Sequence, residues 1–303
     1  MAINDFKYVI IGGSTKCGTT SIYEYLAAHP AVNASIKKES RFFWAGDYTI
    51  GDPALNYKDG IEKYEDVFPK EQSDKIRMEA TPDYLYSKET AELFKQSVND
   101  CKFVFVLRNP VDRIISWYKF SRQLNLIDAS VSIDSYIKNQ FENKTDAVPQ
   151  HMRAVEQGRY GFYLKAWFDV FGMESILVCS YDELSANPKQ LMISISGFIK
   201  IDASFYENYD FKIFNKSVNV KDAENFNKYR TFRRNLRRIL KSVPLGKKIK
   251  SVLKPVDTLY MNKSTNEVWN DIKISEGVLT ELKQLYDRDK IMLEELIKKK
   301  VWW

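Results

Sequence analysis

The apolar positions of this chain form short continuous runs that alternate with longer amphipathic stretches. Continuous runs are typical of strands buried on both faces of a parallel sheet. Strands are predicted over residues 9–11, 76–80, 102–107 and 175–179, with an extended segment over 31–36. Residues 102–107 (KFVFVL) give the strongest strand pattern in the chain.

Apolar residues at helical spacing fill the stretches between these runs. Helices are predicted over residues 21–28, 87–97, from 111 onward, 160–171, 187–199 and 275–300, with shorter ones around 61–68 and within 121–150. Pro30 ends the first helix, because proline disfavours helical geometry in the residue before it. Strands and helices alternate to about residue 200, so the fold class is predicted to be α/β with a central parallel sheet covered by helices.

The composition is that of a globular protein, with 44% hydrophobic and 14% aromatic residues in 303. This length suits one large domain or two small ones. No apolar run reaches the roughly 18 residues of a membrane span, and the first residues do not resemble a signal peptide. A cytoplasmic location is therefore expected.

Cysteine and histidine are scarce, with three and two copies respectively. Neither a disulfide framework nor a metal site of ordinary ligand spacing is expected. The net charge of +6 is uneven, because residues 228–254 are rich in Lys and Arg and contain no Asp or Glu. That basic run predicts a surface that faces anions, such as an acidic polysaccharide or a membrane, or else a solvated helix face.

The first predicted strand breaks into the loop GGSTKCGTTS, residues 12–21, which then enters a helix. A helix start attracts an anion, the hydroxyls of Thr19, Thr20 and Ser21 are hydrogen-bond donors, and Lys16 adds a point charge. In the usual triphosphate loop a lysine follows the second glycine, whereas here Thr19 follows Gly18. The loop is interpreted as a phosphate cradle; the alternative is a glycine-rich turn with a solvated lysine.

A second anion-binding candidate follows the strand at residues 102–107. Arg108 stands at the carboxyl end of that strand, and Ser116 lies in the helix that comes next. Open α/β sheets bind their ligands at the carboxyl ends of strands. The two candidates are therefore expected at the same edge of the sheet.

Together these segments resemble the sulfotransferases that use 3′-phosphoadenosine 5′-phosphosulfate (PAPS), closest in pattern to the carbohydrate enzymes of the heparan sulfate type. Residues 16–21 (KCGTTS) resemble the family's 5′-phosphosulfate loop, and residues 107–118 (LRNPVDRIISWY) resemble its 3′-phosphate segment. Further matching segments, in the same order, are residues 29–43, 79–84, 158–160, 181–184 and 187–188.

The resemblance covers residues 7–217 and implies a P-loop-like three-layer α/β/α fold. It implies a single sulfotransferase domain over 1–303, with a basic helical extension at 218–303. The implied reaction moves a sulfuryl group from PAPS to a hydroxyl or amine of a carbohydrate or glycolipid, and leaves 3′-phosphoadenosine 5′-phosphate (PAP). Neither a metal nor a nucleic acid is implied.

By this resemblance Lys16 stabilises the leaving group, and Glu39 is the general base. The family sometimes uses histidine as the base, and the corresponding place here has none. The neighbouring Phe42, Phe43 and Trp44 predict a raised pKa for Glu39. The alternative is that Glu39 pairs with Lys37, Lys38 or Arg41.

The resemblance also implies two sets of binding residues. Those predicted to bind the donor are Lys16, Cys17, Gly18, Thr19, Thr20, Ser21, Arg108, Ser116, Tyr160 and Lys216. Those predicted on the acceptor side are Glu39, Arg41, Glu79 and Asp83. Core packing is the alternative for Tyr160, and turn capping is the alternative for Asp83.

Two other functions fit parts of the sequence. A P-loop nucleotide kinase or NTPase is disfavoured by the position of Lys16 and by the lack of a strand that ends in an acidic residue for Mg²⁺. A protein that binds anionic surfaces through residues 228–254 would leave the Lys16 loop and Arg108 without a role.

Overall fold

The computed structural model describes residues 8–45, 55–72, 75–98, 100–124, 126–128, 130–142, 150–214, 219–220, 228, 265–266 and 272–303. The chain forms two compact units. The first comprises Met1–Ile114, Gln140–Asn215 and Leu279–Trp303, and the second comprises Ile115–Asn139 and Lys216–Val278. One domain over 1–303 stays a prediction. Lys216 and nearly all of the basic run lie outside the described residues.

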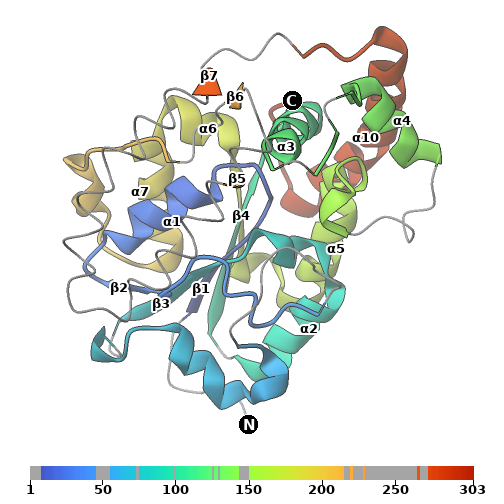
Figure 1. Cartoon of the computed structure of the whole chain (residues 1–303). Helices are drawn as coiled ribbons and strands as arrows, with labels where there is room; N and C mark the ends of the chain where they lie inside the picture. Colours follow the sequence, from blue (N-terminus) through green and yellow to red (C-terminus); the bar gives the residue numbers. More distant parts are fainter. Residues whose placement is uncertain are drawn as a thin grey trace. The chain divides into compact units, whose positions relative to one another are not determined.

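A five-stranded sheet in the order β2-β3-β1-β4-β5 organises the first unit (Figure 1). The strands are β1 (Tyr8–Gly13), β2 (Val32–Ala34), β3 (Ile76–Ala80), β4 (Cys101–Leu107) and β5 (Ile176–Ser180). All neighbouring strands are parallel, and β1 runs through Gly12 and Gly13, beyond its predicted end. The predicted strands and parallel sheet are confirmed.

Alternate side chains of β1, β4 and β5 enter two separate hydrophobic cores. Tyr8 and Ile10 of β1 lie in an aromatic core with α2 (Lys88–Ser97) and α5 (Tyr160–Phe171). Val9 and Ile11 lie in an aliphatic core with α1 (Thr19–Ala27) and α7 (Pro188–Ile199). Figure 1 shows these helix pairs on opposite faces of the sheet. The predicted three-layer α/β/α architecture is confirmed.

The described residues contain four further α-helices and eight short 3₁₀ helices. The other α-helices are α3 (Pro110–Gln123), α4 (Ile133–Glu142), α6 (Tyr181–Ala186) and α10 (Glu276–Ile297). The 3₁₀ helices are η1 (Tyr57–Asp59), η2 (Ile61–Val67), η3 (Lys70–Gln72), η4 (Pro82–Tyr86), η6 (Gln150–Met152), η7 (Glu156–Gly158), η8 (Met173–Ser175) and η9 (Ala203–Glu207). Within the described ranges, no helix combines the length and the apolar character needed to cross a membrane.

The sequence patterns did not predict η4 or α6. Helix α6 is only six residues long and depends on its cap, since the Ser180 Oγ accepts hydrogen bonds from the Asp182 and Glu183 amides at 3.0 and 3.3 Å. Such a short element lacks the repeat of apolar positions that reveals a longer helix.

The second unit contains the later part of α3 and most of α4. The Tyr118 hydroxyl donates to the Val131 carbonyl at 2.6 Å, and its ring lies 5.9 Å from that of Tyr136. Two short strands, β6 (Asn219–Val220) and β7 (Thr265–Asn266), pair in antiparallel fashion. On α3, Trp117 is buried and Ile115 only half-buried.

In the first unit, α10 provides the N-terminal cap of α5. The buried Asp289 carboxylate accepts hydrogen bonds from the Gly161 amide at 2.7 Å and the Phe162 amide at 2.8 Å. A Cβ atom at residue 161 would lie 2.6 Å from the Asp289 carbonyl oxygen, so the close approach requires glycine. This contact fastens the C-terminal helix to the helix that carries Tyr160.

Replacing Asp289 with alanine should destabilise the protein, because two amides at a helix start lose their acceptor. The expected loss is about 1–2 kcal/mol of the free energy of unfolding, the usual range for an N-cap. Urea unfolding followed by tryptophan fluorescence measures it. The control is Asp287→Ala, since Asp287 is exposed on the same helix; equal shifts of the urea midpoint would contradict the capping role.

Candidate functional site

Most of the predicted site residues lie at one edge of the sheet in the first unit; Ser116 belongs to the second unit, and Lys216 lies outside the described residues. The loop with Lys16 follows β1, Asp83 follows β3, and Arg108 follows β4. Parallel strands place their carboxyl ends at the same edge, and Ile11 pairs with Ala80 while Leu107 pairs with Ser180. The strand order reverses at β1, which makes this edge a topological switch point.

The loop after β1 has the geometry of an anion-binding helix start. No side chain caps α1, and its first turn contains no acidic residue. The first amides of a helix lack carbonyl partners within the helix, so they favour an anion. Gly18 has φ +81°, and a Cβ there would lie 2.5 Å from Leu184 Cδ2. Both the backbone angle and the space therefore require glycine.

Several of the predicted donor-binding side chains, in this loop and in α5, are buried. Cys17 is fully buried in the aliphatic core, and Tyr160 is 1% exposed. Thr19 and Ser21 are also buried, while Thr20 is half-buried. An anion at this loop would meet mainly its backbone.

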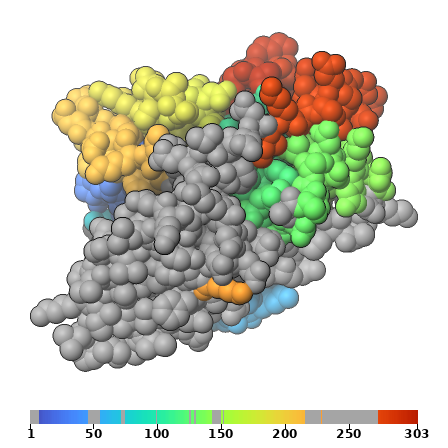
Figure 2. All heavy atoms as spheres, turned by 45° about the horizontal axis from the view of Figure 1, so that its top comes forward, coloured from blue at the N-terminus to red at the C-terminus, as the bar shows by residue number. Residues whose placement is uncertain are grey.

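The chain returns to the loop after η9. The Tyr25 hydroxyl of α1 donates to the Lys212 carbonyl at 2.8 Å, and the Phe214 amide donates to the Ser21 Oγ at 3.5 Å. Figure 2 shows α7 and the η9 segment as a yellow-to-orange surface beside α1 in blue. The described chain thus reaches the donor loop at Phe214, just before the predicted contact Lys216.

The Lys16 ammonium is influenced electrostatically by charged residues from other segments of the first unit. Burial lowers its pKa to about 8. The positive charges of Arg108 and Lys38 act in the same direction, and the negative charge of Glu39 opposes them. Residues far apart in the sequence therefore act electrostatically on one lysine.

Arg108 lies against an aromatic ring rather than a carboxylate. Its guanidinium carbon is 4.5 Å from the centre of the Tyr181 ring. Across the described residues Arg108 forms no ion pair. Ser116 belongs to α3 in the second unit and is half-buried, so its share in a phosphate site stays a prediction.

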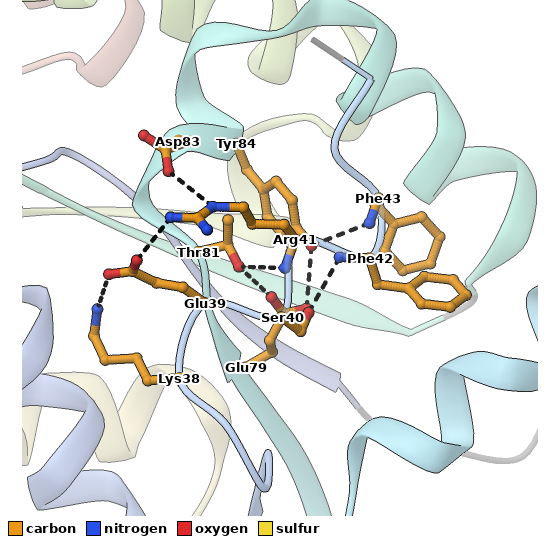
Figure 3. A network of polar contacts seen from close by, with 10 residues as sticks. All are labelled: Lys38, Glu39, Ser40, Arg41, Phe42, Phe43, Glu79, Thr81, Asp83 and Tyr84. Atoms are coloured by element: carbon orange, nitrogen blue, oxygen red, sulfur yellow. Dashed lines mark hydrogen bonds and ion pairs between the residues drawn. The ribbon is translucent and has the colours of Figure 1, made fainter. Parts of the chain in front are cut away.

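Glu39 lies in a chain of alternating charges (Figure 3). Its carboxylate contacts Lys38 Nζ at 2.7 Å and Arg41 Nη2 at 3.1 Å. Arg41 continues to Asp83, with Nε 3.7 Å from Oδ2. The side chain of Glu39 is 36% exposed, whereas those of Arg41 and Asp83 are buried.

The predicted raised pKa of Glu39 is wrong. Burial alone would raise this pKa, but the charges of Lys38 and Arg41 outweigh it and hold the pKa below its usual value. The physical reason is the direction of the side chains: Phe42 and Phe43 enter the aromatic core, while Glu39 lies among cations. The alternative expectation, that Glu39 forms ion pairs with Lys38 and Arg41, agrees with the structure.

Glu79 lies behind this loop, with none of its surface exposed. It accepts hydrogen bonds from the hydroxyls of Thr81 and Tyr84, and burial raises its pKa. The Thr81 hydroxyl also accepts a hydrogen bond from the Arg41 amide at 3.3 Å, and the Tyr84 hydroxyl accepts one from the Phe43 amide at 3.1 Å. Figure 3 shows this arrangement, in which Glu79 fixes the backbone that carries Glu39.

Sequence reasoning did not single out two parts of the site. One is the pair Thr81 and Tyr84, and the other is Arg113, which is wholly buried near the Lys16 loop. Arg113 directly precedes the apolar Ile114 in the predicted helix, and a charge beside an apolar stripe was the available signal.

The sequence comparisons agree with the site. Residues 7–254 match the family model described as "Sulfotransferase domain". The human "Bifunctional heparan sulfate N-deacetylase/N-sulfotransferase 2" is 29% identical over 209 residues, covering 64% of this chain and 22% of that protein. The mouse "Heparan sulfate glucosamine 3-O-sulfotransferase 3B1" is 27% identical over 205 residues, covering 66% of this chain and 48% of that protein. The chain thus spans less than half the length of these relatives.

Among solved structures, a sulfotransferase from Alicyclobacillus acidocaldarius has the same fold. It matches with a TM-score of 0.66 at 19% identity and covers 99% of this chain and 98% of that one. The resemblance stated from the sequence motifs is confirmed. Because the family model spans residues 7–254 of 303, this chain belongs to the sulfotransferase domain family.

Proposed function

We propose that the chain moves a sulfuryl group from PAPS to a hydroxyl or amine of a saccharide and leaves PAP. The supporting observation is the gathering at one sheet edge of an uncapped helix start, Lys16, Arg108 and the carboxylate of Glu39. The names of the relatives specify sulfation of heparan sulfate at nitrogen and at a 3-hydroxyl, which supports a saccharide acceptor.

The residues of the loop suit an anionic donor. The amides at the start of α1 and the Lys16 ammonium are donors for a phosphosulfate group, and Gly18 lets it approach the backbone. Arg108, already oriented by the Tyr181 ring, is proposed to hold the 3′-phosphate. Ser116, Lys216 and the cytoplasmic location stay predictions.

The donor supplies an activated sulfur–oxygen bond. In the transfer this bond breaks, a new sulfur–oxygen or sulfur–nitrogen bond forms at the acceptor, and the acceptor loses a proton. Negative charge develops on the oxygen that remains with PAP. A lysine at that oxygen binds the transition state more strongly than the ground state, which is the role proposed for Lys16.

Glu39 is proposed to take the proton of the acceptor. Lys38 and Arg41 lower its pKa, so Glu39 is ionised at neutral pH but is a weaker base than an unperturbed glutamate. The partial exposure of its carboxylate at the sheet edge is what supports the role. The acceptor-side roles of Arg41 and Asp83 stay predictions. Glu79, which is fully buried, is proposed to position their loop rather than to touch the acceptor.

PAP should raise the unfolding temperature of this protein, because a ligand that binds only the folded state stabilises it. The expected gain is about 2.7 kcal/mol at a concentration 100 times the Kd. A thermal shift series with PAP and with ATP plus Mg²⁺ measures it. Arg108→Gln should weaken the response to PAP but not to adenosine 5′-phosphate. Stabilisation by ATP with Mg²⁺ alone would contradict the proposal and favour a kinase or NTPase.

The affinity for PAP should fall as the pH rises through 8. The free protein has a Lys16 pKa of about 8, and an anionic ligand favours the charged lysine. Binding is therefore strongest below this pKa and weakens above it, as the lysine must first take up a proton. Calorimetric titration between about pH 7 and 9.5 measures the trend. In Lys16→Arg the trend should disappear, since arginine stays charged; an unchanged trend would assign it to another group.

Glu39→Gln should lower the rate of sulfuryl transfer while leaving PAP binding intact. A glutamine cannot accept the proton, and the loss of a general base slows transfer about a hundred- to ten-thousand-fold. The rate is measured with labelled PAPS and a panel of oligosaccharides, and the Kd of PAP serves as the folding control. Glu71→Gln, at an exposed position, should leave the rate unchanged. A full rate in Glu39→Gln would remove Glu39 from the role of base.

A further inference from the structure

Arg113 belongs to a mostly buried polar cluster that includes residues of the loop that carries Lys16, and the proposed function does not use Arg113. All members of the cluster belong to the first unit. They are Ser14, Thr15, Cys17, Tyr86, Arg113, Gln157 and Tyr160. The one basic residue among them is Arg113, which has 0% of its surface exposed.

The guanidinium of Arg113 has only neutral partners. Its Nη1 donates to Thr15 Oγ1 and to Gln157 Oε1, both at 3.3 Å, and its Nη2 donates to the Ala154 carbonyl. Its Nε has no acceptor. Over the described residues, no carboxylate forms an ion pair with Arg113. A buried charge is ordinarily matched by a counter-charge, so this one stands out.

The cluster is joined directly to the donor loop. The Thr15 hydroxyl, which accepts from Arg113, also contacts the Tyr86 hydroxyl at 3.2 Å, and Tyr86 contacts Ser14 Oγ at 3.1 Å. The buried Tyr160 hydroxyl faces Ser14 and Cys17 but makes no hydrogen bond of good geometry. Thr15, the neighbour of Lys16 in the sequence, thus links the Arg113 charge to the donor loop.

We propose that Arg113 is a positioning residue for the 5′-phosphosulfate of the donor. Its buried charge attracts the anion from behind the loop, and its bond to Thr15 holds the loop in place. The anion is then the missing counter-charge. This inference rests on the proposed function.

Burial gives this attraction a signature that separates it from surface charge. Salt screens exposed charges strongly and buried ones much less. Arg113 lies behind the loop that takes the 5′ group, whereas Arg108 is assigned to the 3′-phosphate. A general loss of structure would weaken the binding of all nucleotides alike. Loss of Arg113, which attracts the 5′ anion and holds the loop that receives it, should weaken the binding of nucleotides with a 5′ anion.

The test compares PAP, adenosine 5′-phosphate and adenosine 3′-phosphate by calorimetry at low and high salt. Arg113→Gln should lower the affinity for PAP and for adenosine 5′-phosphate about tenfold or more. This is the size expected for charges several ångströms apart inside a protein. The affinity for adenosine 3′-phosphate should change by less than about twofold. The loss should persist at high salt, and Arg113→Lys should restore most of the affinity.

Arg153→Gln is the matched control, since it removes one positive charge from a partly exposed side chain that pairs with Glu156. It should show no preference between the 5′- and 3′-phosphates. If Arg113→Gln does not fold, Thr15→Val is tested in its place. A weaker affinity for the nucleotides with a 5′-phosphate alone supports the inference, and wild-type affinities for all three nucleotides overturn it.

Equal weakening of all three nucleotides in Arg113→Gln, or no weakening, overturns the role of Arg113. That result leaves the proposed function intact as long as the wild-type protein binds PAP. A wild-type protein that binds neither PAP nor the 5′-phosphate contradicts the proposed function itself.

Discussion

The glycine at position 18, where any Cβ atom would lie 2.5 Å from Leu184 Cδ2, is the constraint on which the candidate site depends. It lets the chain turn in the left-handed region at the end of β1 and begin α1 without a side-chain cap. The amides of the first turn then remain directed at the sheet edge, where an anion satisfies them. Leu184 comes from α6, whose first residue, Tyr181, also packs against Arg108. One short helix therefore packs against both candidate anion-binding segments.

Two carboxylates near this edge show how the environment divides the work. Glu39 lies among cations, which lower its pKa and keep it ionised, whereas burial raises the pKa of Glu79. Glu39 is partly exposed and available for chemistry; Glu79 is enclosed and holds the backbone through Thr81 and Tyr84. Opposite pKa shifts in neighbouring acids commonly accompany a division of roles.

The sequence predicted the layers of the fold well, because β4 and β5 are continuous apolar runs and α5 and α7 are strongly periodic. It also placed Lys16 and Arg108 at strand ends. It could not predict the pKa of Glu39, since adjacent residues of a loop can face opposite ways and only tertiary packing decides which. The burial of Arg113 has the same origin, for its partners Thr15 and Gln157 are distant in the chain.

The central claim is that Lys16 and its loop direct sulfuryl transfer from PAPS to a saccharide. The most direct measurement follows a labelled sulfuryl group in the wild-type protein and in Lys16→Met, with heparan-type oligosaccharides as acceptors. The account predicts that label enters the saccharide in step with the release of PAP, and that Lys16→Met loses this transfer while it keeps its fold. Equal transfer by Lys16→Met, or label released only as free sulfate, would contradict it.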